Sequence, residues 1–168
     1  MQYERDLLNK YIFPEINEIA RKYKEEIHFT DLRWGVNTEE LDSEEGSKKV
    51  LQVCFDEILK CEPYMIIFLG ERYGWIPNME TVMDATSGYH IDVSEPISVT
   101  ELEIQFGALS NKNLDKCIFC IREDLKLDNL QEDDRKKYLP EDEFHKTKLE
   151  LLKEKINQRN PKHVIHYS

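Results

Sequence analysis

The chain has 168 residues, of which 40% are hydrophobic and 34% charged, and its formal net charge is −11. This length suits one domain that buries about 70% of its unfolded surface. The negative charge argues against nucleic-acid binding, and the longest apolar run, near 63–69, is too short to span a membrane. Charged residues at positions 4–6 interrupt any signal peptide. We therefore expect a cytoplasmic protein that binds neither nucleic acid nor membrane.

The first third of the chain predicts a helix, a strand and a second helix. Apolar residues recur at helical spacing over residues 3–24, and Pro14 is expected to kink or divide that helix. The stretch "IHFTDLRW" begins as a strand over 27–32 and has a polar end. An acidic loop is expected over 36–47, followed by an amphipathic helix over 48–61.

The rest of the chain continues this alternation. Residues 77–97 lack a sustained apolar period and predict a long, irregular and mobile loop. The spacing of apolar residues predicts further helices at 99–110 and 143–159, and strands at 64–69, 116–121 and 163–167.

Strands that alternate with helices are typical of a three-layer α/β/α fold, in which a parallel sheet of about four strands has helices on both faces. Ligands of such sheets bind beyond the carboxyl ends of the strands. Two strands end in polar and aromatic residues at that place. These candidate binding residues are Asp31, Arg33 and Trp34 in "DLRWGV", and Glu71, Arg72 and Trp75 in "GERYGW".

The four cysteines predict no metal or redox site. "CIFC" has a C-x-x-C spacing, but it lies in a predicted strand. Residues i and i+3 of a strand point to opposite faces, so Cys117 and Cys120 are expected to be buried and unpaired. The histidines show no metal-binding spacing either, and we expect no metal and no cofactor.

The segment "SEPISVTELEIQFGAL" contains two glutamates of different expected roles. Ser98 and Glu101 have the spacing of a helix capping box, which gives Glu101 a structural role. Glu103 lies near the first turn, either as a solvated carboxylate or as a functional one. Gly107 costs a helix about 1 kcal/mol relative to Ala, which indicates close approach of a neighbouring backbone or ligand.

Together, "DLRWGV", "LGERYGW" and "S-x-T-E-x-E-I" resemble the TIR-like domain of unknown function 4062, over most of the chain up to about residue 122. The resemblance implies a flavodoxin/TIR-like sheet, in a domain that stands at the N-terminus of large proteins with a NACHT or other STAND-type ATPase and a repeat sensor. Nephrocystin-like, telomerase-associated and bacterial antiviral-defence proteins are of this type. In the family a strand precedes "MQ.ERD", so residues 1–168 are expected to form a single domain that lacks its first strand and has an incomplete C-terminus.

The wider superfamily of TIR domains and nucleoside 2-deoxyribosyltransferases includes enzymes that cleave the bond between ribose and base. Their T-x-x-E-x-G-x-A-like motif resembles Thr100–Ala108, although the glycine here is residue 107 instead of 105. The resemblance therefore implies Glu103 as the catalytic residue and NAD or a related nucleotide as substrate. Asp31 would bind ribose hydroxyls or simply pair with an arginine, Arg33 and Arg72 would hold a phosphate, and the aromatic residues Trp34, Tyr73 and Trp75 would stack on a base. Glu71 belongs to the same set of candidate substrate-binding residues.

Other interpretations remain open at this point. The charged residues at the strand ends can form an ion-pair network among themselves, with both tryptophans at the rim of the core. The chain is then a non-catalytic module that self-associates or docks on other domains of a larger multidomain protein. A metal-dependent nuclease or phosphatase, with Asp31, Glu71 and Glu103 as ligands, has no supporting motif.

Overall fold

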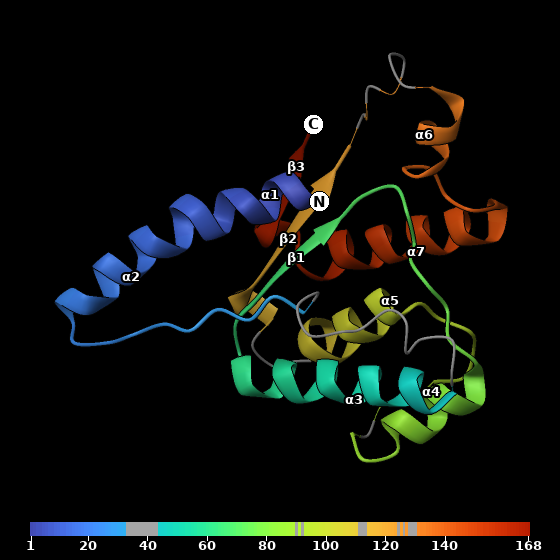
Figure 1. Cartoon of the computed structure of the whole chain (residues 1–168), viewed down its shortest axis with the longest axis horizontal. Coiled ribbons are helices and arrows are strands. Elements are labelled where there is room, and N and C mark those ends of the chain that lie inside the picture. Colours follow the sequence, from blue (N-terminus) through green and yellow to red (C-terminus); the bar gives the residue numbers. More distant parts are fainter. Residues whose placement is uncertain are drawn as a thin grey trace. The chain divides into compact units, whose positions relative to one another are not determined.

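The computed structural model describes residues 1–32, 44–89, 91, 93–110, 114–123, 125, 127 and 131–168. The chain forms two compact units, Met1–Trp34 and Gly35–Ser168, whose elements are drawn in Figure 1. Two predicted site residues, Arg33 and Trp34, lie outside the described residues.

The N-terminal unit is built on a helix that Pro14 divides, as predicted. Helix α1 (Gln2–Leu7) leads into a wide π-helical turn at Leu8–Ile12, and α2 (Phe13–Lys22) follows. Pro14 has no N–H with which to bond the preceding turn, and its ring crowds that turn. The backbone widens instead, and the Phe13 N–H bonds to the carbonyl of Leu8, five residues back.

The strand predicted over 27–32 is wrong, because this segment belongs to the N-terminal unit and runs back along its helix. The Ile27 N–H donates to Asn17 Oδ1 at 2.9 Å, and the Phe29 ring stacks on Phe13 with 3.7 Å between centroids. Asp31 pairs with Arg5 of α1. These contacts with a helix take the place of the strand-to-strand hydrogen bonds that the β-branched and aromatic residues suggested.

The C-terminal unit contains a parallel sheet of three strands in the order β1-β2-β3, which confirms the α/β class. The strands are β1 (Met65–Leu69), β2 (Cys117–Arg122) and β3 (Val164–Tyr167), with Ile67 opposite Phe119 and Cys120 opposite Ile165. The accompanying helices are α3 (Glu44–Cys61), α4 (Met79–Thr86), α5 (Val99–Ile104), α6 (Glu132–Lys136) and α7 (Glu143–Arg159), with a π-helical turn at Gln105–Leu109 and 3₁₀ turns at Leu114–Lys116 and Pro161–His163.

Side chains along each strand point alternately to the two faces of the sheet, and one of these faces forms the core. Ile67, Leu69, Phe119 and Ile121 lie in one buried cluster with residues of α5, of the π turn and of α7, among them Ile104, Ala108, Leu149, Leu152 and Ile156. Both crossovers progress in the same direction across the sheet, and right-handed crossovers then place their helices on the same face. On the other face Ile66, Ile118 and Ile165 are 41, 38 and 52% exposed.

Two expected loops are partly helical. Helix α3 begins at Glu44, where a loop was predicted up to residue 47, and Gly46 and Ser47 are buried. The long loop predicted over 77–97 contains α4, whose Thr81, Val82, Ala85 and Thr86 are buried. Asn78 caps α4 by accepting a hydrogen bond from the Glu80 N–H at 2.9 Å. This helix has only eight residues, too few for its apolar spacing to stand out in the sequence.

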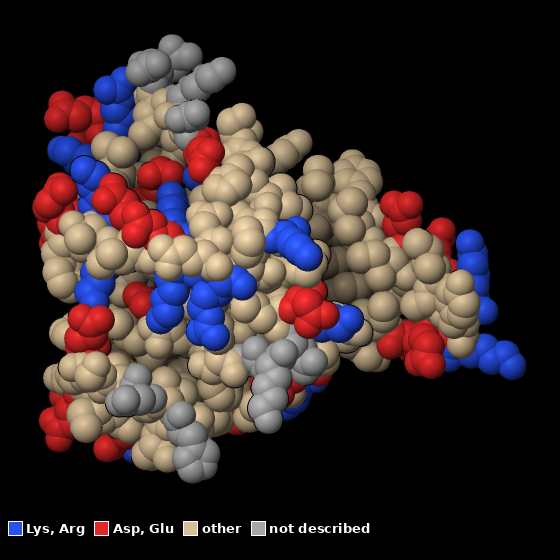
Figure 2. Space-filling model, turned by 180° about the vertical axis from the view of Figure 1, so that it is seen from behind, with Lys and Arg blue, Asp and Glu red and all other residues tan. Residues whose placement is uncertain are grey.

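Charged side chains are spread over the surface. On the face shown in Figure 2, basic side chains are interspersed with acidic ones. In the part of the chain that the structure describes, no helix combines the length and the apolar character that crossing a bilayer requires. The absence of nucleic-acid binding stays a prediction.

Gly107 is needed where α3, β1 and the π-helical turn after α5 meet. A Cβ atom built at residue 107 would lie 2.7 Å from Ile58 Cγ2 and 2.8 Å from Met65 Sδ. The close approach that the glycine indicated is therefore real, but its neighbours are two side chains of the core and neither a backbone nor a ligand.

We expect Gly107→Ala to destabilise the fold. The added methyl improves helix propensity by about 1 kcal/mol, but overpacking against the stiff Ile58 side chain costs about 1–3 kcal/mol. The net loss should be up to about 2 kcal/mol in urea-induced unfolding. Gly88→Ala is the matched control, because a Cβ there meets nothing within 4 Å. Equal stability of the two variants would contradict the packing explanation.

Candidate functional site

The segment that follows β1 is fastened to the start of α5 by a buried hydrogen-bond network. The Tyr73 hydroxyl donates to Glu101 Oε2, and the Gln105 side-chain amide donates to Glu101 Oε1 at 2.8 Å. Tyr73 is 1% exposed and Glu101 8%. Tyr73 is thus a core residue and is not available to stack on a base, contrary to the expectation from sequence.

The capping box is half confirmed. Ser98 Oγ accepts a hydrogen bond from the Glu101 N–H at 3.1 Å, as expected of an N-cap. The Glu101 carboxylate, however, does not return to the backbone of Ser98, because Tyr73 and Gln105 occupy it. The structural role of Glu101 is therefore confirmed, but Glu101 fulfils it by binding Tyr73 in the segment after β1 and not by capping the helix.

Two backbone features complete this junction. The Val99 N–H donates to the Trp75 carbonyl at 3.0 Å. Gly74 has φ +100°, in the left-handed region that glycine favours, and a Cβ there would lie 3.1 Å from Thr100 Oγ1. The glycine in "RYGW" thus serves a tight turn against α5, and the Trp75 side chain remains 42% exposed.

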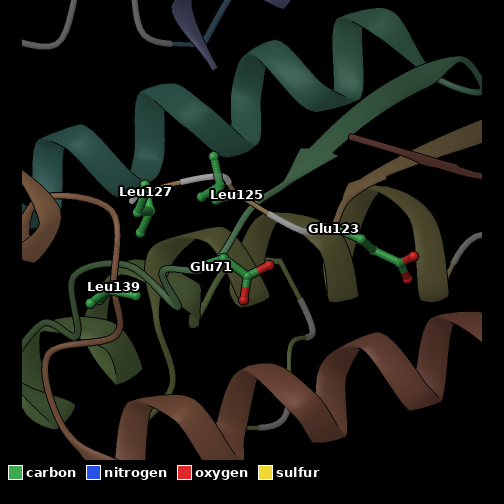
Figure 3. Close-up of a pocket in the computed structure, with 5 residues that line it drawn as sticks. All are labelled: Glu71, Glu123, Leu125, Leu127 and Leu139. Carbon is green, nitrogen blue, oxygen red and sulfur yellow. The ribbon is translucent and has the colours of Figure 1, made fainter. Parts of the chain in front are cut away.

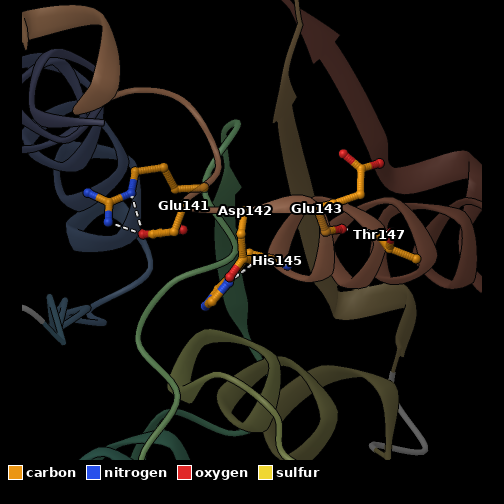
Figure 4. A network of polar contacts seen from close by, with 6 residues as sticks. Glu141, Asp142, Glu143, His145 and Thr147 are labelled. Carbon is orange, nitrogen blue, oxygen red and sulfur yellow. Dashed lines mark hydrogen bonds and ion pairs between the residues drawn. The ribbon is translucent and has the colours of Figure 1, made fainter.

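The two charged residues of "GERYGW" form ion pairs with residues of α7 or just before it. Lys153 Nζ lies 3.2 Å from Glu71 Oε1. Arg72 Nε donates to Glu141 Oε1 at 2.8 Å, and Figure 4 shows Glu141 beside Asp142 and His145. For Glu71 and Arg72, these ion-pair partners lie outside the two motifs.

Electrostatics at the start of α7 are dominated by these contacts. Burial alone would raise the pKa of Glu141, but hydrogen bonds from Arg72 and the Glu141 backbone outweigh it and hold this pKa below its ordinary value. Asp142 caps α7, because it accepts from the His145 N–H at 2.8 Å and lies 2.7 Å from His145 Nδ1. The backbone and ring contacts of His145 lower the pKa of Asp142.

An open hollow of about 430 Å³ lies where β1 and β2 end (Figure 3). Two carboxylates, Glu71 and Glu123, line it, together with the apolar residues Leu125, Leu127 and Leu139. His166 Nδ1 lies 2.6 Å from Glu123 Oε1. The sequence did not single out Glu123, although it follows β2 almost as Glu71 follows β1, and that parallel was the available signal. Carboxylates beside leucines suit a ligand with hydroxyl groups and an apolar ring.

Glu103 lies on α5, two residues beyond Glu101, and faces α3. It is partly buried, and Cys54 of α3, itself 3% exposed, lies near enough to feel its charge. Burial first, and then the nearby Glu103 carboxylate, raise the pKa of Cys54 far above its ordinary value. The thiol therefore stays protonated at neutral pH.

The structure brings some predicted site residues together and leaves the others untested. Glu71, Arg72 and Trp75 belong to one segment at the end of β1, and Asp31 belongs to the N-terminal unit. The joint site of all seven residues stays a prediction. Cys117 and Cys120 both lie in β2, as expected, and no group of three His, Cys, Asp or Glu among the described residues is placed to hold a metal.

A family model matches almost the whole chain. The family model described as "Domain of unknown function (DUF4062)" matches residues 1–167. The chain belongs to the DUF4062 family. The match includes both the "GERYGW" segment and the start of α5, which the structure joins through Tyr73 and Glu101.

Several curated proteins contain a segment similar to this DUF4062 domain. A TPR repeat-containing protein of Dictyostelium discoideum is 27% identical over 93% of the chain. Telomerase protein component 1 of Mus musculus is 33% identical over 62% of the chain, and the human NACHT and WD repeat domain-containing protein 2 is 36% identical over 42%. The chain spans 10% of the first of these proteins and 4% of each of the others. No solved structure matches.

We expect Tyr73→Phe to destabilise the domain by about 1–3 kcal/mol, because it leaves a buried carboxylate oxygen without its donor. Urea unfolding measures this loss. Tyr89→Phe is the control, since Tyr89 bonds Asp56 at 2.7 Å near the surface, and its loss should be below about 1 kcal/mol. Equal losses in the two variants would argue against a special role for the Tyr73 bond.

The same pair predicts an alkaline dependence of stability. Burial, and then the Glu101 hydrogen bond and charge, raise the pKa of Tyr73 above its ordinary value of 10.0. Its contribution to stability is therefore complete below pH 10 and is lost as the pH rises above that value. The difference in unfolding free energy between wild type and Tyr73→Phe should be constant up to about pH 10 and should shrink as the pH rises from there toward pH 12. A difference that stays constant over that upper range would contradict this linkage.

Proposed function

We propose that this DUF4062 domain is a TIR-like signalling or effector module, N-terminal in a larger protein with a NACHT or other STAND-type ATPase. The observation that carries the proposal is the family match over residues 1–167, joined to relatives that are many times longer and are named for NACHT and repeat domains. The small parallel sheet supports this role, because charged and aromatic residues follow the carboxyl end of β1, where ligands of such sheets bind.

The proposed chemistry is cleavage of the N-glycosidic bond of NAD or a related nucleotide, with Glu103 as the catalytic residue. Such cleavage passes through an oxocarbenium-like state that a nearby carboxylate stabilises or traps. One observation supports Glu103: it is partly buried on α5, where an ionised side chain is screened less by water than on an open surface.

The proposed binding residues would divide the substrate among them. Glu71 would accept hydrogen bonds from ribose hydroxyls, with Asp31 in the same role from the N-terminal unit. Trp75 and Trp34 would stack on the base. Arg72 and Arg33 would hold phosphate, and for Arg72 this means exchanging its ion pair with Glu141 for a phosphate oxygen.

A second candidate is a non-catalytic module that self-associates or docks on other domains. It is favoured by the ion pairs that Glu71 and Arg72 already make within the chain, and by the exposed Ile66, Ile118 and Ile165 on one face of the sheet. An interaction role needs no rearrangement of those ion pairs.

The distinguishing experiment is release of nicotinamide from NAD, with Glu103→Gln expected to abolish it. The substitution keeps the size of the side chain and removes the charge that stabilises the oxocarbenium-like state. The chain is assayed both alone and clustered on a fused oligomerising coiled coil. Glu150→Gln, on the exposed side of α7, is the matched control and should retain full activity.

Glu101→Gln is not a neutral control, because Glu101 is buried and holds Tyr73. Undiminished release by Glu103→Gln would remove this residue from catalysis. If the clustered wild-type chain releases no nicotinamide, the non-catalytic module becomes the better description.

A further inference from the structure

The hollow shown in Figure 3 lies beyond the ends of two neighbouring strands. Glu71 lies two residues after β1, and Glu123 directly follows β2. These strands run parallel, with Leu69 opposite Ile121, so both glutamates leave the sheet at the same edge. The hollow has a volume of about 430 Å³, within the range of roughly 300–1,000 Å³ that is typical of small-molecule sites.

Each of the two carboxylates has one oxygen bonded within the protein. Glu71 Oε1 lies 3.2 Å from Lys153 Nζ, and Glu123 Oε1 lies 2.6 Å from His166 Nδ1. The other oxygen of each carboxylate has no hydrogen-bond partner among the described residues. A carboxylate offers about four acceptor positions. Both side chains are therefore oriented by a protein partner and still have acceptor positions left for a ligand.

The rest of the lining is apolar and consists of Leu125, Leu127 and Leu139. Leu139 is 42% exposed, and the other two leucines are partly buried. Arg135 Nε donates to the Leu127 carbonyl at 2.8 Å, which ties the segment after β2 to α6. Leucine side chains offer no hydrogen bond, so the part of a ligand that they contact is an apolar surface such as the face of a ring.

From this lining we infer that the hollow binds a nucleoside: Glu71 and Glu123 accept hydrogen bonds from the ribose hydroxyls, and the three leucines contact the base. The two hydroxyls of a ribose stand on adjacent carbons and supply one donor for each carboxylate. Hydrogen bonds to an ionised acceptor are stronger than those between neutral groups. An anion such as phosphate would instead be repelled by the two carboxylates.

The inference rests on the proposed function in taking the ligand to be part of a dinucleotide such as NAD, which carries two nucleosides. Glu103, the proposed catalytic residue, is not among the residues that line the hollow. The nucleoside in the hollow is therefore the one whose glycosidic bond stays intact, the adenosine half of NAD. Glu123 thereby becomes a binding residue, and Trp75 remains available to stack on the base that is released.

The first test titrates the full chain with adenosine and with 2′,3′-dideoxyadenosine, which keeps the base but lacks both hydroxyls. Leucine methyl signals in NMR spectra, assigned with Leu125→Met, Leu127→Met and Leu139→Met, report binding at the hollow. Adenosine should shift these signals and should bind about tenfold more tightly than the dideoxy compound, because it makes the charge-assisted hydrogen bonds. Signals that stay in place, or equal affinities for the two compounds, overturn the inference.

The same titration of Glu123→Gln assigns the hydroxyl contact to this residue. Adenosine should bind about tenfold more weakly than to wild type, and dideoxyadenosine should bind with unchanged affinity. The Glu123 side chain is 54% exposed, so the substitution should leave folding intact. Glu150→Gln, an exposed carboxylate of α7 outside the hollow, is the matched control and should bind both compounds as wild type does. Unchanged binding of adenosine to Glu123→Gln overturns the inference.

The second test separates this site from the proposed reaction. In the nicotinamide-release assay, Glu123→Gln should raise the KM for NAD about tenfold and leave kcat within about twofold, because the residue contacts the half that is not cleaved. A wild-type KM in Glu123→Gln overturns the inference and leaves the proposed reaction standing. If wild type releases no nicotinamide while adenosine shifts the leucine signals and Glu123→Gln weakens its binding, the nucleoside site is supported and the proposed reaction alone fails.

Discussion

The buried hydrogen bond between Tyr73 and Glu101 is the constraint on which the C-terminal unit depends. It joins the segment leaving β1 to the first turn of α5, across 28 residues of sequence. A carboxyl side chain at 8% exposure requires hydrogen-bond donors, and Tyr73 and Gln105 supply them. Because the partners come from two elements, neither element can shift without exposing or orphaning a polar group.

This junction also separates two glutamates that look alike in sequence. Residues two apart on a helix point about 200° apart around its axis, so Glu101 and Glu103 leave α5 on different sides. Glu101 turns to Tyr73, and the hydrogen bonds of its carboxylate stabilise the fold. Glu103 turns to α3, where its charge raises the pKa of the buried Cys54 thiol. One carboxylate thus secures the helix that carries the other.

The sequence predicted the strands over 64–69, 116–121 and 163–167 well, because each is an apolar run with its own local pattern. It failed at 27–32, where the pattern was equally strand-like. Whether such a run becomes a strand depends on a partner backbone, and the contacts of Ile27, Phe29 and Asp31 go to a helix. Short α4 was missed because eight residues carry little periodic signal.

The candidate site was also predictable only in part, because a sequence pattern shows local features but not the distant residues that contact them. The position of the motif identified Glu71 and Arg72 as residues at a strand end. Their partners, Lys153 and Glu141, are 82 and 69 residues away, and no sequence pattern identifies them as partners. Tyr73 was misjudged because alternation after a strand does not reveal whether a ring turns inward. The influence of Glu103 on Cys54 depends on how α5 packs against α3, and no local sequence pattern reveals that packing.

The contacts around β1 fall into two energetic classes, and this division bears on function. Buried bonds such as Tyr73–Glu101 are costly to break, because water cannot replace the lost partner. The ion pairs of Glu71 and Arg72 lie near the surface, where such pairs contribute about 0–1 kcal/mol and solvent or another charge can substitute for either member. A ligand phosphate or a partner's carboxylate can therefore displace Glu141 from Arg72 at little cost, while the junction beneath stays intact. The same strand end then serves either of the two proposed roles, with its geometry held by Tyr73 and its charges free to exchange partners.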